Sequence, residues 1–490
     1  MKHKNIMIYG TASNAGKSIV VTGLCRIFKQ DGYKVSPFKS QNMALNSYVT
    51  DSGGEIGVAQ AIQAEAAGVN PEIYMNPILM KPTSDRKSQI ILNGKALQNM
   101  DAAEYFVKRK LMKEEVMKSY NYIRENYDIS VIEGAGSPAE INLKQDDIVN
   151  TGMAEMADSP AILVGDIDRG GVFASIYGTI MLLTEEERKR VKGVIINKFR
   201  GDVALLEPGL KMLEELINKP VLGVLPYFEV NVGDEDSLSS KFDMVKNDGI
   251  INLSIIKLKH TSNFTDFDPL YNCKELNIKY VESGSEMGDE DIIVIPGSKN
   301  TIEDLKVIKE SGIAEKIVRA VRNGKMVLGI CGGYQMLGQK VIDKNGIESS
   351  LKEINGLGLF DSETMFESEK ITEKYRGKIE GLSGEFSVMN GMSVSGYEIH
   401  HGITGKTRER RFESKGAVLG TYIHGIFEND RFTSEILKIA GEKKGVEINK
   451  EIRDYKSYKE SEFDKLAEIF RKNLDIDKIY KIMDGEDIVI

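Results

Sequence analysis

Short apolar runs alternate with amphipathic helical patterns through the first half of the chain. Six runs rich in β-branched residues predict strands at residues 5–9, 34–38, 129–132, 161–164, 194–196 and 221–224. Segments with apolar residues at helical spacing follow them, as expected of a parallel sheet covered by helices. The pattern therefore predicts an N-terminal α/β domain over residues 1–235.

A second series of the same kind begins near residue 250. Its apolar runs predict strands at residues 253–256, 291–295 and 326–330, and the series continues to about residue 443. The stretch between the two series, residues 231–249, is polar and mostly acidic, which is typical of a linker or surface excursion. We therefore predict a second α/β domain over residues 250–443.

The remaining tail, residues 444–490, is rich in lysine and glutamate. Phe463, Leu466, Phe470 and Leu474 recur there at helical spacing and form one apolar stripe. This pattern predicts a helical extension whose apolar face packs on a neighbouring element.

Charge and cysteine content exclude several classes of protein. Among 490 residues, 65 basic and 74 acidic side chains leave a net charge of -9, which argues against nucleic acid or an anionic membrane as the main partner. No apolar stretch is long enough for a membrane span or a signal peptide. Cys25, Cys273 and Cys331 are too widely spaced for a disulfide framework or a zinc site. We therefore expect a cytoplasmic protein with no membrane span.

A glycine-rich loop, GTASNAGKS at residues 10–18, stands between the first strand and a helical pattern. Backbone N–H groups in such a loop cradle phosphates, Lys17 would neutralise the outer phosphates of ATP, and the Ser18 hydroxyl would bind Mg²⁺. Gly16 precedes the lysine, as the motif requires. The spacing departs from the strict Walker pattern, because Thr11 occupies the place of the first glycine and Gly10 lies one residue earlier.

This longer loop resembles that of dethiobiotin synthetase and its relatives, which activate carboxyl or carbamate groups with ATP. Glu133 directly follows a buried strand in IEGAGSP and could hold Mg²⁺, although a surface glutamate before a turn would give the same pattern. The resemblance implies that Asn197 contacts the adenine of ATP. It also implies that Lys39, in PFKSQN, contacts the γ-phosphate.

A second catalytic motif follows the strand at residues 326–330. Cys331 lies within GICGGYQMLG, a cysteine version of the nucleophile elbow, in which small residues permit a strained turn between strand and helix. The helix N-terminus favours the thiolate, and the N–H of Gly332 can face a developing oxyanion. Gly297, in the loop PGSKNT, could supply the second oxyanion donor, and Gln335 is a candidate for binding glutamine.

A thiolate also needs a base. His424, in TYIHGIF, lies 93 residues after Cys331, a separation similar to that in class I glutamine amidotransferases. Those enzymes have a glutamate two residues after the histidine, whereas this chain has Ile426, so a Cys-His pair is expected and its third member is left open. His400 and His401 are adjacent in a predicted strand and would point to opposite faces, which argues against a shared metal ion.

Nine segments in order resemble the cobyric acid synthases, the glutamine-hydrolysing family of cobalamin biosynthesis. They are GTASNAGKS, PFKSQNMALNS, EIGVAQAIQAEAAG, NPILMKPTSD, EGAGSPAEINL, GDIDRGGVFAS, PGSKNT, GICGGYQMLG and GYEIHHG. The likeness extends from residue 1 to about residue 443. It implies a P-loop synthetase domain joined to a glutaminase domain of the class I type.

The same resemblance implies the reaction and its small-molecule substrates. The family amidates the b, d, e and g carboxylates of adenosylcobyrinic acid a,c-diamide to give adenosylcobyric acid, and each amidation consumes one ATP and one glutamine. An acidic protein needs local positive charge to bind a corrinoid polycarboxylate. The best candidates are Lys39 in PFKSQN and Lys81 in LMKPTSD, each after an apolar run, with Arg86 and Lys87 close behind Lys81; a solvated surface role is the alternative for each.

Three other interpretations differ in class or substrate. Cobyrinic acid a,c-diamide synthase shares both modules and acts on a different corrinoid. A partitioning-type ATPase would lack the glutaminase half, and a binding protein with an inactive elbow is disfavoured by intact Lys17, Cys331 and His424. The sequence leaves open the oligomeric state, the order of the amidations and the path of ammonia.

Overall fold

The structure, a computed structural model, describes residues 3–82, 87–233, 246, 249–405, 408–448, 454–486 and 488. The chain folds into two compact units. The first comprises Met1–Ala44, Thr50–Asp236 and Tyr458–Ile490, and the second comprises Leu45–Val49 and Ser237–Ser457. The polar stretch expected as a linker at 231–249 lies largely outside the described residues, so that expectation stays a prediction.

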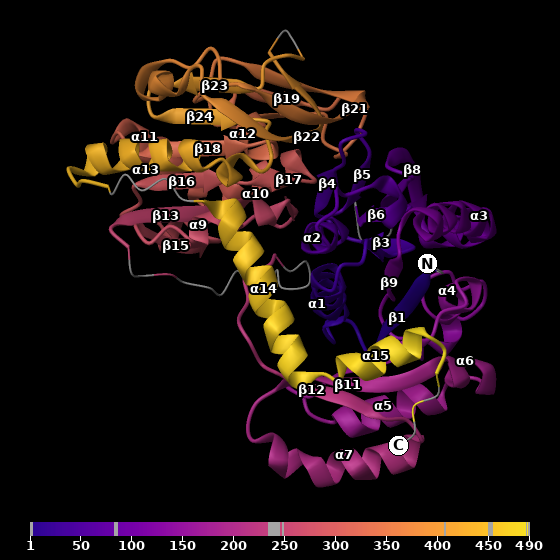
Figure 1. Ribbon diagram of the computed structural model, residues 1–490. Coiled ribbons are helices and arrows are strands. Elements are labelled where there is room, and N and C mark those ends of the chain that lie inside the picture. The colour runs from indigo at the N-terminus through magenta and orange to yellow at the C-terminus, as the bar shows by residue number, and fades with distance from the viewer. Residues whose placement is uncertain are drawn as a thin grey trace. The chain divides into compact units, whose positions relative to one another are not determined.

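A six-stranded parallel sheet forms the centre of the first unit, in the order β12-β11-β10-β1-β9-β2 (Figure 1). Its strands are β1 (Lys4–Gly10), β2 (Val35–Phe38), β9 (Ile129–Glu133), β10 (Ala161–Asp166), β11 (Val191–Phe199) and β12 (Val221–Pro226). The six apolar runs of the N-terminal half correspond to these strands, so the parallel α/β architecture predicted from the sequence is confirmed.

Both faces of this sheet are covered. Along β1, Ile6 and Ile8 are buried in one hydrophobic cluster while Met7 and Tyr9 are buried in another, because successive strand residues point to opposite faces. The covering helices are α1 (Lys17–Gln30), α2 (Val58–Ala66), α3 (Ala102–Asn126), α4 (Thr151–Met156), α5 (Val172–Met181), α6 (Glu185–Arg190) and α7 (Val203–Ile217).

A smaller sheet, β3-β6-β7-β8, is inserted between β2 and β9 in the sequence. Its strands are β3 (Gln41–Met43), β6 (Ile78–Pro82), β7 (Lys87–Leu92) and β8 (Lys95–Asp101), and the short β5 (Glu55–Gly57) precedes α2. The sheet carries Lys81 near the C-terminal end of β6, where Lys81 pairs with Gln89 of β7 in antiparallel register.

The C-terminal helices α14 (Tyr455–Asn473) and α15 (Ile476–Met483) supply apolar residues to the core of the first unit. Phe470 lies so close to α1 that a Cβ atom added at Gly23 would be 2.4 Å from its ring. Arg26 of α1 forms ion pairs with Glu460 and Asp464 of α14 at 2.8 and 2.7 Å. The apolar stripe of the tail thus packs against the helix that follows the phosphate loop.

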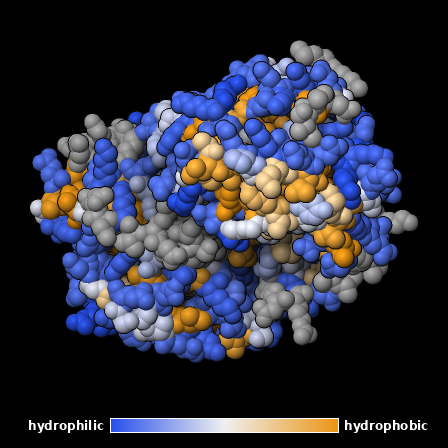
Figure 2. Space-filling model, turned by 90° about the horizontal axis from the view of Figure 1, so that it is seen from below, coloured by the Kyte–Doolittle hydropathy of each residue, from blue (hydrophilic) through white to orange (hydrophobic). Residues whose placement is uncertain are grey.

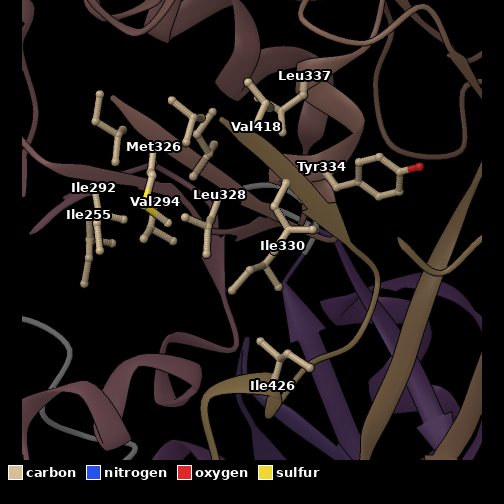
Figure 3. Packing of buried hydrophobic residues seen from close by; sticks show 14 of the residues in the cluster. Ile255, Ile292, Val294, Met326, Leu328, Ile330, Tyr334, Leu337, Val418 and Ile426 are labelled. Carbon is tan, nitrogen blue, oxygen red and sulfur yellow. The ribbon is translucent and has the colours of Figure 1, made fainter. Parts of the chain in front are cut away.

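The second unit is built on another six-stranded sheet, in the order β15-β13-β16-β18-β24-β23, parallel except for β23. Its strands are β13 (Ile251–Ile256), β15 (Leu276–Val281), β16 (Ile292–Ile295), β18 (Met326–Ile330), β23 (Phe412–Lys415) and β24 (Val418–Thr421). Figure 3 shows the core of this sheet, where Ile292, Val294, Met326 and Leu328 lie side by side on neighbouring strands.

Helices and a second sheet complete this unit. The helices are α9 (Asp268–Tyr271), α10 (Thr301–Glu310), α11 (Ile313–Arg322), α12 (Gly332–Leu337) and α13 (Asp430–Lys444). The second sheet contains β19 (Lys340–Ile342), β20 (Glu353–Asn355), β21 (Glu363–Lys378) and β22 (Ser393–Thr404), and the short β14 (Thr261–Ser262) pairs with β17 (Gly297–Ser298). This last pair lies next to the elbow described below.

Exposed apolar side chains gather on α5 and α7 of the first unit. Figure 2, seen from the side on which α7 lies in Figure 1, shows hydrophobic residues grouped on this face. The exposed members are Phe173, Tyr177, Val203, Leu205, Met212 and Leu216. Among the described residues, no helix is both long and apolar enough to cross a membrane.

Candidate active sites

Cys331 stands at a strained turn between β18 and α12 of the second unit. Its backbone has φ 50° and ψ −108°, a conformation that side chains rarely adopt and that is typical of a nucleophile elbow. Neighbouring glycines permit the turn: a Cβ atom on Gly333 would lie 2.0 Å from the carbonyl oxygen of Ile295. The thiol is buried, and its Sγ lies 3.6 Å from the carbonyl oxygen of Ile399.

His424 lies next to this thiol and is held by a carboxylate that sequence reasoning missed. Its Nδ1 donates to Oδ2 of Asp266 at 2.7 Å, and Oδ1 of Asp266 accepts the N–H of Gly425 at 2.8 Å. Tyr397 stacks on the imidazole at 5.4 Å between ring centroids. Asp266 lies in the 3₁₀ turn η3 (Phe264–Phe267) and is the candidate for the third member that the sequence left open.

The electrostatics of this group favour a charged imidazole. Burial lowers the pKa of His424, but the charge and hydrogen bond of Asp266 and the contact with Cys331 outweigh burial and raise the pKa to about 10. The imidazolium is therefore the main form at neutral pH. It can stabilise a thiolate on Cys331 and give a proton to a leaving group.

The Gly297 N–H, expected to supply the second oxyanion donor, is directed at β14 and not at the elbow. Gly297 is opposite Ser262 in the antiparallel β14–β17 pair, and Lys299 N–H donates to His260 two residues along. Because hydrogen-bonded pairs alternate in such a ladder, the Gly297 N–H faces β14 and the Ser298 N–H faces away from it. A Cβ atom on Gly332 would lie 2.8 Å from the Ser298 nitrogen, which places that amide beside the elbow.

A pocket opens over Cys331. Its lining consists of Ser262, Asn263, Ser298, Lys299, Cys331, Gln335, Glu348, Lys370, Ile399, His400, His401 and His424. The amide of Gln335 is engaged within the protein, since its Oε1 accepts from Thr301 Oγ1 at 3.2 Å and its Nε2 donates to the Tyr422 hydroxyl at 3.4 Å. Gln335 therefore braces the pocket wall behind the nucleophile.

His400 and His401 have separate surroundings, as expected for adjacent strand residues. Nδ1 of His400 lies 2.7 Å from the Gly402 carbonyl oxygen and its Nε2 lies 3.2 Å from Glu398. Nδ1 of His401 lies 3.1 Å from the carbonyl oxygen of Glu367. Within the described part of the chain, no three His, Cys, Asp or Glu side chains are grouped to hold a metal ion.

The first unit holds the phosphate loop between β1 and α1, as the sequence predicts. Gly16 caps α1 with φ 101°, a left-handed conformation that favours glycine. The Lys17 ammonium donates to the carbonyl oxygens of Ala12 and Gly136, both at 3.0 Å, so it bridges the loop and the segment after β9. Thr11 N–H donates to the Val164 carbonyl oxygen at 2.9 Å, while Gly10 ends β1. The loop is thus anchored to two strands of the sheet.

Glu133, at the end of β9, collects three donors. Its Oε1 accepts from Ser18 Oγ at 2.9 Å and from Lys39 Nζ at 2.7 Å, and its Oε2 accepts from Gln63 Nε2 at 2.6 Å. Burial raises the pKa of Glu133, but the charge of Lys39 and these hydrogen bonds leave it below the usual range. The predicted metal and γ-phosphate residues therefore share one cluster around the buried Glu133, with an ionised carboxylate beside a hydroxyl.

Asn197 lies near the C-terminal end of β11 and contacts the phosphate loop. Its Nδ2 donates to the carbonyl oxygen of Ala15 at 3.1 Å, whereas its buried Oδ1 has no hydrogen-bond partner. A buried acceptor without a donor is costly. An amino group of a bound nucleotide would satisfy this atom, so the residue fits the adenine contact that the resemblance implies.

Lys81 is not open to an incoming substrate. Its ammonium forms an ion pair with Glu55, and the two side chains are only 1% and 2% exposed. The sequence expectation assumed a cation facing the corrinoid, whereas the structure shows a charge satisfied inside the first unit. The neighbouring Arg86 lies outside the described residues, and Lys87 is exposed at the start of β7.

No sequence signal indicated Asp266. The segment NFTDFDP contains two aspartates and lies 158 residues before its partner His424, with no motif to distinguish either carboxylate. The unusual burial of a charged side chain, at 3% exposure, becomes visible only in the folded chain.

Comparison with known proteins agrees with this arrangement. Residues 6–236 match the CobQ/CobB/MinD/ParA nucleotide binding domain, and residues 252–432 match the CobB/CobQ-like glutamine amidotransferase domain. A cobyric acid synthase from Caldanaerobacter subterraneus subsp. tengcongensis is 52% identical over 98% of this chain and 98% of its own length. Those from Clostridium novyi and Listeria monocytogenes are 50% and 49% identical, and each alignment covers 99% of this chain and 98% of the relative. The chain therefore belongs to the cobyric acid synthase family of glutamine-hydrolysing amidoligases.

Proposed function

We propose that the chain converts adenosylcobyrinic acid a,c-diamide to adenosylcobyric acid by amidating its b, d, e and g carboxylates with glutamine nitrogen and ATP. The observation that carries the glutaminase half is the Asp266–His424 contact of 2.7 Å beside the elbow of Cys331. It gives the buried cysteine an oriented, charged acid–base partner. Because ATP and glutamine are supplied in the cytoplasm, the proposal places the reaction there.

In the second unit, Cys331 Sγ attacks the carboxamide carbon of glutamine. The oxyanion is received by the N–H groups of Gly332 and Ser298, with Gly297 shaping the loop between them and His424. His424 gives its proton to the departing nitrogen, so ammonia leaves and a thioester remains. Water, deprotonated by His424, then hydrolyses the thioester to glutamate and restores the thiolate–imidazolium pair.

In the first unit, a substrate carboxylate attacks the γ-phosphate of ATP to give an acyl phosphate and ADP. The loop at residues 10–18 would hold the phosphates, Lys17 would balance the charge that builds up on them, and Asn197 would bind the base. Ammonia then attacks the acyl carbon, and phosphate leaves as the amide forms. Lys39 would act on the γ-phosphate once its ammonium separates from Glu133.

Mg²⁺ fits the same cluster. A hydroxyl and an ionised carboxylate, Ser18 and Glu133, are hard oxygen ligands, and Mg²⁺ commonly takes one or two such groups together with phosphate oxygens and water. When bound, Mg²⁺ would neutralise charge on the nucleotide phosphates. The Ser18–Glu133 hydrogen bond holds these two side chains side by side, so they would be available together as ligands.

The substrate assignment is tested with purified enzyme, ATP, Mg²⁺ and glutamine labelled with ¹⁵N in its amide. Adenosylcobyrinic acid a,c-diamide should gain one label at each of the b, d, e and g positions, read by mass spectrometry. A cobyrinic acid a,c-diamide synthase would leave this compound unchanged and would instead amidate cobyrinic acid. Absence of label from the a,c-diamide, with label on cobyrinic acid, would assign the chain to that alternative.

A further inference from the structure

Among the side chains that line the pocket over Cys331, Glu348 and Lys299 carry opposite charges and are not among the groups assigned above to amide hydrolysis. Glu348 belongs to the segment between β19 and β20, and Lys299 precedes α10. Hydrolysis of a carboxamide needs a nucleophile, a base and oxyanion donors. These roles were assigned above to Cys331, to His424 and to backbone N–H groups. The two charges therefore call for another explanation.

The structure holds Glu348 firmly in place. The carboxylate of Asp343 accepts the backbone N–H groups of Ile347, Glu348 and Ser349 at 2.8, 2.9 and 3.1 Å, which fixes the turn that carries Glu348. Oε2 of Glu348 accepts the N–H of Thr301 at 3.1 Å. A fixed backbone and one fixed oxygen leave the carboxylate at the edge of the pocket in a defined position.

Thr301 also links Glu348 to the elbow. The hydroxyl of Thr301 donates to Gln335 of α12, and a Cβ atom on Gly332 would lie 3.1 Å from that hydroxyl. Glu348 is therefore separated from the nucleophile turn by a single residue. Glu348 and Cys331 also line the same pocket.

The charge of Glu348 is incompletely balanced. Burial raises its pKa to about 7, although the N–H of Thr301 and the charge of Lys299 act in the opposite direction. Among the described residues, neither Glu348 nor Lys299 has an oppositely charged side chain within 4.0 Å. A partly buried carboxylate in this state gains most from a cation that brings its own hydrogen bonds.

We propose that Glu348 and Lys299 recognise the amino-acid end of glutamine, with Glu348 receiving the α-ammonium and Lys299 the α-carboxylate. The assignment rests on the proposed glutaminase role of this pocket and deepens it, because it explains how glutamine is chosen over simple amides. A zwitterion matches an anion and a cation that line the same pocket without an ion pair to another described side chain. Hydrogen-bonding sites reject analogues that leave their charges unpaired.

Entry of glutamine requires movement at the rim. The enclosed space of the pocket is about 20 Å³, which is room for roughly one water molecule. Lys299 is partly exposed, and its long, flexible stem can swing outward and close again over the bound carboxylate. Glu348, held by Thr301 and Asp343, stays as the fixed element against which the ammonium docks.

Two analogues separate the two contacts. Glutaramate lacks the α-ammonium of glutamine, and 4-aminobutanamide lacks the α-carboxylate, while both keep the carboxamide. Release of ammonia is measured for each compound with the full-length enzyme and its Glu348→Gln and Lys299→Met variants. The wild-type enzyme should prefer glutamine to both analogues.

Glu348→Gln should lower kcat/KM for glutamine roughly 10- to 100-fold, mainly through KM, and leave glutaramate unchanged, because that analogue never used the contact. Lys299→Met should do the same for glutamine and leave 4-aminobutanamide unchanged. Matched controls are Glu353→Gln on β20 and Lys306→Met on α10, both exposed residues outside the pocket. Thermal melting confirms that each variant is folded.

If a variant lowered kcat/KM equally for glutamine and for the analogue that lacks the charged group bound by the replaced residue, the assignment would be overturned. The residue would then act on the pocket as a whole. A folded variant with an unchanged kcat/KM for glutamine would also overturn the assignment. Both results leave the glutaminase proposal intact, whereas a wild-type enzyme that releases no ammonia from glutamine would remove the function itself.

Discussion

Asp266 and His424 meet at 2.7 Å although 158 residues separate them in the chain. The contact replaces the glutamate that class I amidotransferases have two residues after the histidine, where this chain has Ile426. A carboxylate on Nδ1 fixes the ring so that Nε2 is the nitrogen that faces the reaction. The triad geometry is thus reached with an acid from a different part of the chain.

Replacement of Asp266 tests this role directly. Asp266→Asn should lower glutamine-dependent ammonia release roughly 100-fold, because the asparagine no longer orients and charges His424. Synthesis driven by ammonium chloride should change far less. Ammonia release at the wild-type rate would show that His424 needs no carboxylate partner.

The same pair predicts a pH dependence of stability. The pKa of His424 is raised from 6.5 to about 10 in the folded state, so the protonated ring stabilises the fold. This contribution is fully present below pH 6.5 and disappears as pH rises to about 10. The stability difference between wild type and Asp266→Asn, measured by denaturant unfolding, should therefore shrink over that range. A difference that stays constant with pH would contradict the raised pKa.

Complementary losses separate the two half-reactions. Cys331→Ala should abolish glutamine-dependent synthesis and retain synthesis from ammonium salt, since the thiolate serves only amide hydrolysis. Lys17→Ala should abolish both, because phosphoryl transfer precedes the attack of ammonia. Rates are measured as corrinoid amide formed per enzyme. If a folded Cys331→Ala enzyme loses both activities, the two-site scheme is wrong.

Glu133 can be tested through its metal. Glu133→Gln should raise the Mg²⁺ concentration needed for half-maximal synthesis by roughly 10-fold or more, because a neutral amide is a weaker ligand than a carboxylate. Glutamine hydrolysis in the second unit provides the internal control and should keep its Mg²⁺ response. An unchanged Mg²⁺ titration of synthesis would argue that Glu133 serves only to pair with Lys39.

Lys81 should matter for folding through its buried pair. Lys81→Met leaves Glu55 buried without its cation and should cost roughly 3–5 kcal/mol of unfolding free energy. Combining it with Glu55→Gln should recover part of that loss, which denaturant titration can measure. A stable Lys81→Met protein with a raised corrinoid KM would instead support the substrate contact that the sequence suggested.

Much of the fold was determined locally and could be predicted from the sequence. The apolar runs located all six strands of the first sheet. The turns after β1 and β18 could also be predicted, because their glycine, lysine, serine and cysteine residues lie at fixed distances in sequence from the end of a strand. Periodicity and motif spacing are properties of neighbouring residues. They therefore survive in the sequence without knowledge of the fold.

Contacts between residues from distant segments became visible only in the tertiary structure. Asp266 meets His424, Glu55 buries Lys81, and Thr301 holds Glu348 across separations of 158, 26 and 47 residues. The sequence does not show whether a charged side chain will be solvated or will be buried in an ion pair. Packing decides between these outcomes, because only the folded chain removes the water and supplies the partner that makes burial of a charge tolerable.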